Sequence, residues 1–347
     1  MYQLWHQYEL VLEVQGESIK VHAPDKLPFD LRHEPVVKYS HWLEWLKRRI
    51  STISRTYMNQ LYKQRRLGRG HVEVINDSAA VSVVDMFWVS TPELSHTWDN
   101  LQVLRDENLA TVKASLEGVI DKEEMLSILQ KGPQDTTSVL TVKGAFPKSI
   151  YKGHLLKKGD NAEYEVSAYK LGYKLGFDVA KAETYQDGAV ACTLFTDERT
   201  SMVHALEMLY PFNPPTTRDI YVKALEKYAG TALEKQLQRL FMFNYLVCNF
   251  DFHGENFGFL YSPESFELLG VAPAYDFNSA FDAYGDITAY DSDIFTRLPQ
   301  FINNNLDLIP NLKRTAEYLA TDPYLNQEQK NEVVSRADYL IALTQHA

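Results

Sequence analysis

Residues 249–256 read Asn-Phe-Asp-Phe-His-Gly-Glu-Asn, and residues 274–278 read Ala-Tyr-Asp-Phe-Asn. Within these two stretches, Asn256 follows Asp251 by five residues, and Asp276 follows Asn256 by twenty. Phosphoryl transfer needs a carboxylate that orients the acceptor hydroxyl, together with amide and carboxylate oxygens that hold Mg²⁺ on the ATP phosphates. The spacing therefore predicts a phosphotransferase site, in which Asp251 is catalytic and Asn256 and Asp276 bind the metal.

The sequence around these stretches favours the same interpretation. Residues 240–247 predict an apolar helix just before the first stretch, and an apolar hairpin is predicted between the two. Residues 271–275 predict a strand that leads to Asp276. An isolated Asp-x₄-Asn pair is common, whereas its combination with a histidine, a hairpin and Pro-Ala-Tyr-Asp is rare. The competing interpretation is a set of polar loops at helix ends. A zinc site at His253 is not favoured, because no second His or Cys lies at ligand spacing.

The composition of the 347-residue chain is that of an ordinary globular protein, with 45% hydrophobic and 23% charged residues. Its net charge of -11 argues against general binding to nucleic acids or anionic membranes. The two cysteines, Cys192 and Cys248, lie in apolar runs, which predicts buried thiols and a reducing compartment. The first residues do not read as a signal peptide, and no apolar run is long enough to span a bilayer.

Residues 142–149, Val-Lys-Gly-Ala-Phe-Pro-Lys-Ser, are a candidate cover for the phosphates. A glycine between two strands lets backbone N–H groups approach phosphate oxygens, although an ordinary loop can also contain Gly and Pro. We assign the phosphate-binding cation to Lys157, which ends an apolar strand just before a helix. Lys152 is the alternative, and either lysine could also be a solvated side chain.

Glu165 is the candidate carboxylate that would hold this lysine in place. Residues 162–175 predict an amphipathic helix, and Val166 and Leu171 belong to its apolar stripe. Glu165 therefore lies beside the packed face of the helix, where an ion pair with Lys157 would orient the lysine on the α- and β-phosphates. The plainer interpretation is a glutamate on the helix surface.

The first part of the chain predicts an accessory region. Residues 9–22 alternate apolar and polar, as a strand or hairpin does, and residues 38–66 predict a helix. Shorter helical signals follow over residues 98–131. Residues 131–135, Lys-Gly-Pro-Gln-Asp, form the strongest domain boundary in the chain.

After this boundary the pattern changes to strands and then to helices. Strands are predicted over residues 149–152, 154–158 and 190–195, and the helix over 162–175 is closed by Gly176. From about residue 201 the pattern is mainly helical. We therefore expect an α+β, two-lobed protein-kinase-like fold with the active site in the cleft between the lobes. Its parts are an accessory α/β region over residues 1–132, a β-rich lobe over 133–198 and a helical lobe over 199–347.

The same residues resemble those of the HipA-like serine/threonine kinases. Residues 249–259 look like the catalytic loop of that family, and residues 272–276, Ala-Pro-Ala-Tyr-Asp, resemble its metal-binding segment. Residues 144–148, Gly-Ala-Phe-Pro-Lys, resemble its Gly-Ala-x-Pro-Lys phosphate loop, and residues 165–176 resemble the helix of its first lobe. The resemblance covers residues 138 to about 285, and we expect it to extend through the C-terminal helices. It also implies a bacterial or phage protein with a cytoplasmic location.

This resemblance implies an ATP- and Mg²⁺-dependent kinase that phosphorylates Ser or Thr of a protein. It implies an antitoxin-like protein partner as well, and autophosphorylation of a hydroxyl beside the phosphate loop. The residue roles that it implies are a catalytic aspartate at Asp251, metal ligands at Asn256 and Asp276, an ion pair of Lys157 and Glu165, nucleotide contacts at Gly144, Ala145, Lys148 and His253, and phosphate acceptors at Thr141 or Ser149.

A basic cluster stands out in the otherwise acidic chain. The sharper interpretation is a surface for RNA, DNA or an acidic partner, and the plainer one is a solvated helix face paired with acidic residues. Its members lie between residues 47 and 69, with tyrosines between them: Lys47, Arg48, Arg49, Arg55, Lys63, Arg65, Arg66 and Arg69.

Two other functions remain open at the level of the sequence. The first is a small-molecule or lipid phosphotransferase, which would use a related catalytic loop. It remains open because nothing in the motifs identifies the phosphate acceptor. A nucleotide-binding pseudokinase or interaction module would keep the site and act through its N-terminal region. Label transfer from ATP to the protein itself separates the kinase from the pseudokinase.

Overall fold

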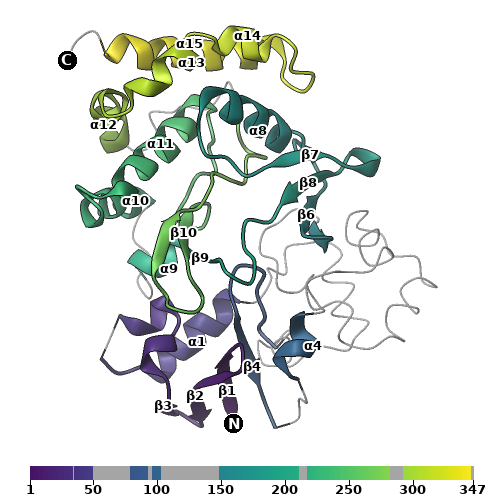
Figure 1. Cartoon of the computed structure of the whole chain (residues 1–347), viewed down its shortest axis with the longest axis vertical. Coiled ribbons are helices and arrows are strands. Elements are labelled where there is room, and N and C mark those ends of the chain that lie inside the picture. Colours follow the sequence, from purple (N-terminus) through teal and green to yellow (C-terminus); the bar gives the residue numbers. More distant parts are fainter. Residues whose placement is uncertain are drawn as a thin grey trace. The chain divides into compact units, whose positions relative to one another are not determined.

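The computed structural model describes residues 1–33, 35–49, 79–92, 96–102, 148–210, 217–281 and 292–344 (Figure 1). Backbone contacts divide the chain into two units. Unit 1 consists of Met1–Gly159, Thr196–Val203 and Ser262–Glu267, and unit 2 of Asp160–Phe195, His204–Tyr261 and Leu268–Ala347. Thr141, Gly144, Ala145 and the expected boundary at residues 131–135 lie outside the described residues. The three-part domain division therefore stays a prediction.

Unit 1 contains an antiparallel sheet with the strand order β3-β2-β1-β4. Leu4 in the inner strand β1 pairs with Leu12 on one side and Val89 on the other, and all three side chains are fully buried. The strand pair β2 and β3 confirms the hairpin that alternation predicted over residues 9–22. The four strands are β1 (Tyr2–His6), β2 (Glu9–Gln15), β3 (Ser18–Val21) and β4 (Phe87–Ser90).

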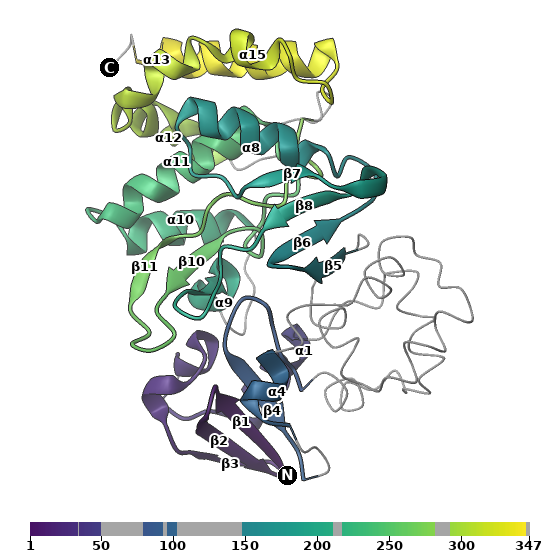
Figure 2. The same ribbon diagram turned by 45° about the vertical axis from the view of Figure 1, so that its right-hand side comes forward.

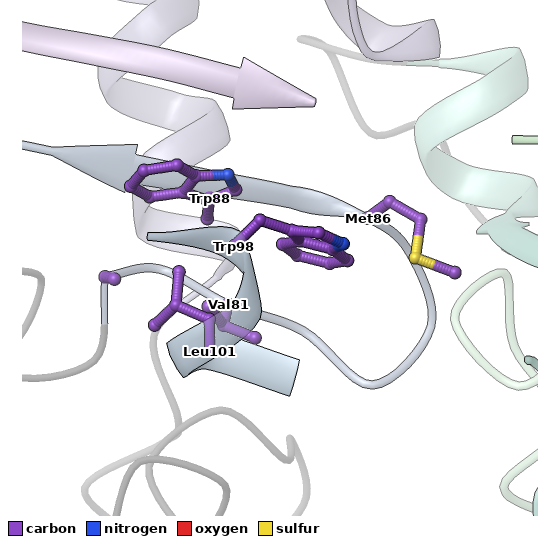
Figure 3. Close-up of a cluster of buried hydrophobic side chains, with 6 residues drawn as sticks. Val81, Met86, Trp88, Trp98 and Leu101 are labelled. Carbon is purple, nitrogen blue, oxygen red and sulfur yellow. The ribbon is translucent and has the colours of Figure 1, made fainter. Parts of the chain in front are cut away.

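The helices of unit 1 that the structure describes are short and rich in aromatic residues. Helix α1 (Tyr39–Arg48) confirms the start of the helix predicted over residues 38–66, of which residues 50–66 lie outside the described part. Helix α4 (Trp98–Gln102) contributes Trp98 to a second buried cluster. Figure 3 shows that cluster, in which the side chains of Val81, Met86, Trp88 and Leu101 gather around the indole of Trp98. Two 3₁₀ turns, Pro24–Lys26 and Phe29–Arg32, connect the sheet to α1.

The described basic residues of α1 are paired within unit 1. Arg49 is buried and forms two hydrogen bonds of 2.7 Å with the carboxylate of Asp85. Lys47 lies 2.6 Å from Glu44, and Arg48 lies 3.7 Å from Asp30. The acidic partners that the plainer interpretation predicted are present for these three residues, but Arg49, which directly follows α1, is buried and not solvated. The members beyond residue 49 lie outside the described part.

Strands β5 (Lys148–Tyr151) and β6 (His154–Lys157) form a hairpin near the end of the segment Met1–Gly159 of unit 1. Its turn contains Lys152 and Gly153, both in the left-handed region with φ of 49° and 72°. Glycine adopts this conformation without a steric penalty, which explains a tight turn at this point. The hairpin confirms the two strands that the sequence predicted around Gly153.

In unit 2, helix α8 (Tyr164–Leu175) ends at Gly176, whose φ of 87° gives a left-handed cap. This cap confirms the predicted helix end. Helix α8 packs against the antiparallel pair β7 (Ala182–Thr184) and β8 (Val190–Thr193), as Figure 2 shows. Strand β8 confirms the buried strand predicted from Val190, and the buried free thiols of Cys192 and Cys248 confirm the prediction for the cysteines.

The rest of unit 2 is mainly helical, and helix α11 (Ala232–Leu246) lies at its centre. It contacts α10 (Thr217–Lys227), α12 (Ser292–Asn303), α15 (Gln327–Leu343) and β11 (Leu268–Val271). Strand β10 (Gly258–Tyr261) pairs with β11, which confirms the predicted hairpin. The remaining elements are α9 (Ala205–Leu209), α13 (Ile309–Leu312), α14 (Thr315–Leu319) and the 3₁₀ turns Gln186–Gly188 and Leu306–Leu308.

The prediction of helix from about residue 201 is wrong at its start, because β9 (Ser201–His204) is a strand. Its burial explains the error: Ser201, Met202 and Val203 are all buried, and a short apolar run has no helical or strand period of its own. The described part of the chain is a mixed α/β fold. None of its helices is long and apolar enough to cross a membrane.

Candidate active site

The loop that begins at Asn249 is held at the C-terminal end of α11. Cys248, with a φ of 52°, turns the chain away from the helix axis. The backbone N–H of Asn249 donates to the carbonyl of Asn244 at 3.1 Å, so the last helical turn is closed by the loop itself. A segment further along the chain supports the loop, because Phe281 donates to Val247 at 2.7 Å and Phe250 donates to Ser279 at 3.3 Å.

Phe252 anchors the middle of the loop in the core of unit 2. Its ring stacks on Tyr221 with a centroid distance of 5.1 Å and an interplanar angle of 7°. The Tyr221 hydroxyl also donates a hydrogen bond to the Phe252 carbonyl. The side chains on either side of the buried Phe252 are exposed to solvent, by 55% for Asp251 and 37% for His253. A solvent-facing carboxylate on a fixed backbone is what an incoming hydroxyl requires.

Asp251, His253 and Asn256 are held together by contacts within the loop. The Nε2 atom of His253 lies 3.6 Å from Oδ1 of Asp251. The amide nitrogen of the buried Asn256 donates to the carbonyl of Asp251 at 2.5 Å, and its backbone N–H donates to the carbonyl of His253 at 2.8 Å. Since the amide nitrogen is engaged inside the loop, the amide oxygen is the atom that Asn256 can offer to a cation.

Gly254 allows the loop to pack closely against two neighbouring elements. A Cβ atom at this position would lie 2.6 Å from Cδ1 of Ile220 on α10 and 3.2 Å from Cβ of Leu206 on α9. The carbonyl of Gly254 also accepts a hydrogen bond of 2.9 Å from Leu206. A glycine is needed here for space, because any side chain would push the loop away from α9 and α10.

The segment that carries Asp276 differs from the strand that the sequence predicted over residues 271–275. Strand β11 ends at Val271, and Ala274 instead forms an isolated parallel bridge with Val179. Ala274 donates to the carbonyl of Asp178 and accepts from Ala180, both at 2.9 Å. Pro273 has no backbone N–H and cannot continue a ladder, which explains the short pairing. Asp276 follows with a φ of 67°, a left-handed conformation that Asp tolerates better than most residues.

Two hydrogen bonds connect this segment to the loop. The Tyr275 hydroxyl donates to the carbonyl of Glu255 at 3.0 Å. The amide nitrogen of Asn249 donates to the carbonyl of Asp276 at 3.4 Å and to Oδ1 of Asn244 at 2.8 Å. The structure thus brings Asp276 beside the loop of Asp251 and Asn256. The sequence analysis assigned no role to Asn249 and Tyr275. Their hydrogen-bonding side chains lie close to the metal-ligand candidates in the sequence, and this position could have indicated that they support the site.

The other predicted residues are distributed over both units. Lys157 in β6 pairs directly with Lys148 in β5, and both side chains are buried. Directly paired residues share one face of a strand pair, where like charges destabilise each other unless anions are close by. Ser149 is fully buried beside them, and Lys152 is exposed in the turn. Glu165, on α8 of unit 2, is buried as well.

The oxygen atoms of Asn256 and Asp276 fit a hard cation. Amide and carboxylate oxygens suit Mg²⁺, which is usually held by one or two protein ligands together with phosphates and water. Within the described ranges, no group of three or more His, Cys, Asp or Glu side chains is placed to hold a metal.

The mixed α/β fold is similar to that of HipA, a protein of a toxin–antitoxin system. HipA of Shewanella oneidensis MR-1, solved with HipB and its operator DNA, matches with a TM-score of 0.60 and 15% identity, covering 100% of this chain and 97% of that one. The proinflammatory kinase CtkA of Helicobacter pylori gives a TM-score of 0.39 and 19% identity over 57% of this chain and 92% of that one. The search of curated proteins gave no match.

The model of the HipA-like C-terminal domain matches residues 114–335, which is more than half of the chain. This protein therefore belongs to the HipA-like family, and the resemblance drawn from residues 144–148, 249–259 and 272–276 is confirmed.

Proposed function

We propose that this protein is a HipA-type kinase that transfers the γ-phosphate of ATP to a Ser or Thr hydroxyl of a protein. The observation that carries the proposal is the pair of hydrogen bonds that connects residues 249–256 with Tyr275 and Asp276. These bonds hold an exposed carboxylate and two hard oxygen ligands in one part of unit 2. The family membership supports the same reaction class. The two-lobed layout with an accessory region is part of this proposal.

In the proposed reaction, Asp251 orients the acceptor hydroxyl and accepts its proton as the new P–O bond forms and ADP leaves. His253, 3.6 Å from the carboxylate, restricts its orientation and contributes to the nucleotide site. Asn256 and Asp276 would hold Mg²⁺, which supplies charge neutralisation on the phosphate oxygens when bound. Lys157 neutralises charge on the phosphates, Glu165 is the carboxylate that the family resemblance assigns to this lysine, and Gly144, Ala145 and Lys148 complete the phosphate contacts.

Autophosphorylation is proposed at Thr141, and Ser149 is the second candidate. Ser149 is fully buried within β5, where it pairs with Leu156, so its hydroxyl can meet a phosphate only if this hairpin opens. A test is mass spectrometry after incubation with ATP. Phosphate on residues 136–149 supports the proposal, and its absence in a protein that phosphorylates other substrates contradicts it.

The decisive experiment is transfer of label from ATP in the presence of Mg²⁺. We compare the wild type with Asp251→Ala and Asp276→Ala, and with Asp338→Ala as a matched control, because Asp338 is an exposed carboxylate on α15. Wild type and control should label a protein, and the two site variants should lose at least about 100-fold of the rate. Equal labelling by Asp251→Ala would refute the assignment of the site.

The same experiment separates the remaining functions. ATP binding without label transfer to protein, followed by transfer to a small alcohol or a lipid, would favour a phosphotransferase for small substrates. ATP binding without any transfer would identify a pseudokinase. We also propose an antitoxin-like protein partner, by analogy with the HipB in the Shewanella complex. Co-purification of a small DNA-binding protein encoded beside this chain would support that partner. If the kinase has the same activity and the same effect on its host with and without that protein, the partner is ruled out.

A further inference from the structure

The hydroxyl of Tyr275 lies between two polar groups of unit 2. It donates to the carbonyl oxygen of Glu255 at 3.0 Å and lies 3.1 Å from Nδ1 of His204. A tyrosine hydroxyl has one proton, and the Glu255 carbonyl can only accept. The contact with His204 is therefore one in which Nδ1–H donates to the tyrosine oxygen. This arrangement specifies the neutral tautomer of His204 that carries its proton on Nδ1, or the protonated ring.

The position of this chain of hydrogen bonds in the sequence is informative. Glu255 immediately precedes Asn256, and Tyr275 immediately precedes Asp276. The Tyr275 hydroxyl thus connects the two residues that directly precede the metal-ligand candidates Asn256 and Asp276. Consecutive Cα atoms lie at a fixed distance of about 3.8 Å. A shift of the backbone at Glu255 or Tyr275 therefore also displaces the ligand candidate that follows it in the sequence.

Packing restricts the ring of Tyr275 independently of its hydroxyl. The ring lies 5.6 Å from that of Phe195, centroid to centroid, at an interplanar angle of 39°. His204 is likewise held, because it directly precedes α9, and Ala205 donates to the carbonyl of Phe257 at 2.9 Å. The hydroxyl is therefore the part of Tyr275 that acts on the loop, and a Phe side chain can occupy the same space.

We propose that Tyr275, supported by His204, is a positioning residue that fixes the spacing between Asn256 and Asp276 and thereby sets the affinity of the site for a divalent cation. The inference rests on the proposed kinase function, which assigns the cation to these two ligands. Residues that orient metal ligands through hydrogen bonds usually change metal affinity 10–100-fold when they are substituted. Tyr275 and His204 act through the loop and do not touch the phosphates in this proposal.

The test measures cation binding directly and does not depend on turnover. Mn²⁺ is titrated by electron paramagnetic resonance in the presence of a non-hydrolysable ATP analogue, with the wild type, Tyr275→Phe and Tyr228→Phe. Tyr228 is the matched control, because its hydroxyl contacts Sδ of Met208 at 3.5 Å. We expect Tyr275→Phe to bind Mn²⁺ about 10-fold more weakly, with the wild-type affinity for the analogue alone, and Tyr228→Phe to match the wild type.

A second variant tests the role of His204. His204→Ala removes the donor to Tyr275 but leaves the hydrogen bond to Glu255, so a smaller loss of Mn²⁺ affinity is expected. The double variant should bind no more weakly than Tyr275→Phe alone, because His204 acts through the tyrosine hydroxyl. Additive losses would overturn the role of His204 and leave Tyr275 as a positioning residue on its own.

The outcomes distinguish this inference from the function on which it rests. If the wild type binds Mn²⁺ with the analogue and Tyr275→Phe binds it equally well, the positioning role is wrong and the kinase proposal stands. If the wild type binds no Mn²⁺ with the analogue, both are wrong. Should Tyr275→Phe unfold, the affinity of His204→Ala decides, since a wild-type value there contradicts the proposal.

Discussion

The side-chain amide nitrogen of Asn256 donates to the backbone carbonyl of Asp251 at 2.5 Å, so one side chain both closes the loop and presents an oxygen. Such a bond makes the position of the proposed base dependent on the proposed ligand. An aspartate at position 256 would keep an oxygen ligand and lose the donor. It would also place a carboxylate against the carbonyl of Asp251, which repels it.

Asn256→Asp should therefore lower both stability and phosphate transfer. Removal of one partner from a buried hydrogen bond costs about 1–3 kcal/mol of unfolding free energy. Transfer should fall at least about 10-fold, because the base moves with the loop. The control is Asn331→Asp on α15, where the exposed Asn331 only accepts a hydrogen bond from Gln327, a role that aspartate retains. Urea unfolding and initial rates measure the two effects, and equal rates for both variants would contradict the coupling.

Gly254→Ala should displace the loop of residues 249–256, since its Cβ would lie 2.6 Å from Cδ1 of Ile220. Overpacking of this kind typically costs about 1–3 kcal/mol. Ile220→Val removes that methyl group, so the double variant should recover part of the stability and of the transfer rate. The contact at 3.2 Å with Cβ of Leu206 stays, and recovery is expected to be incomplete. No recovery at all would show that Gly254 is required for its backbone and not for space.

The salt bridge between Arg49 and Asp85 should contribute far more to stability than the pair of Lys47 and Glu44. Arg49 makes two hydrogen bonds to the carboxylate and further ones to the carbonyls of Ala80 and Phe87. Arg49→Lys keeps the charge but cannot form this fork, and the loss of buried hydrogen bonds to a charged group costs about 1–3 kcal/mol. Lys47→Ala, at a largely exposed pair, should cost less than about 1 kcal/mol.

Tryptophan fluorescence can follow this difference, because all five tryptophans of the chain lie in unit 1. A urea midpoint for Arg49→Lys equal to that of Lys47→Ala would mean that the buried pair adds no stability.

His6 should make unit 1 less stable in acid. Burial, followed by smaller effects of Lys26 and Arg32, lowers the pKa of His6 from 6.5 to about 4, while Asp85 opposes the shift. Between these values the unfolded chain binds a proton that the folded chain excludes, so the free energy of unfolding falls as the pH drops from about 6.5 to about 4. The full effect amounts to about 3 kcal/mol.

His6→Phe removes the titrating group and keeps the aromatic contacts with Phe87 and Phe266, whose rings lie 4.9 and 5.0 Å from His6. Its tryptophan-detected stability should lose this component of the pH dependence between pH 6.5 and 4. Parallel pH profiles for the wild type and His6→Phe would show that the imidazole titrates normally in the folded state.

Local patterns of the sequence were sufficient to predict several helices and strands and to identify the family. The alternation over residues 9–22, the helix cap at Gly176 and the hairpin around Gly153 depend on backbone preferences within a few residues, which a sequence carries directly. The spacing of Asp251, Asn256 and Asp276 pointed to one site, because the chemistry of phosphate transfer restricts which residue types can serve it.

The sequence by itself determined the family, the ends of the local elements and the residues offered for chemistry. Only the tertiary structure decided that Ser201–His204 is a strand, that Arg49 is buried against Asp85 and that the Tyr275 hydroxyl reaches Glu255. The physical reason is the range of the interactions. Periodicity and capping act between neighbours along the chain, whereas burial and these hydrogen bonds join residues that are distant in sequence and meet only after packing.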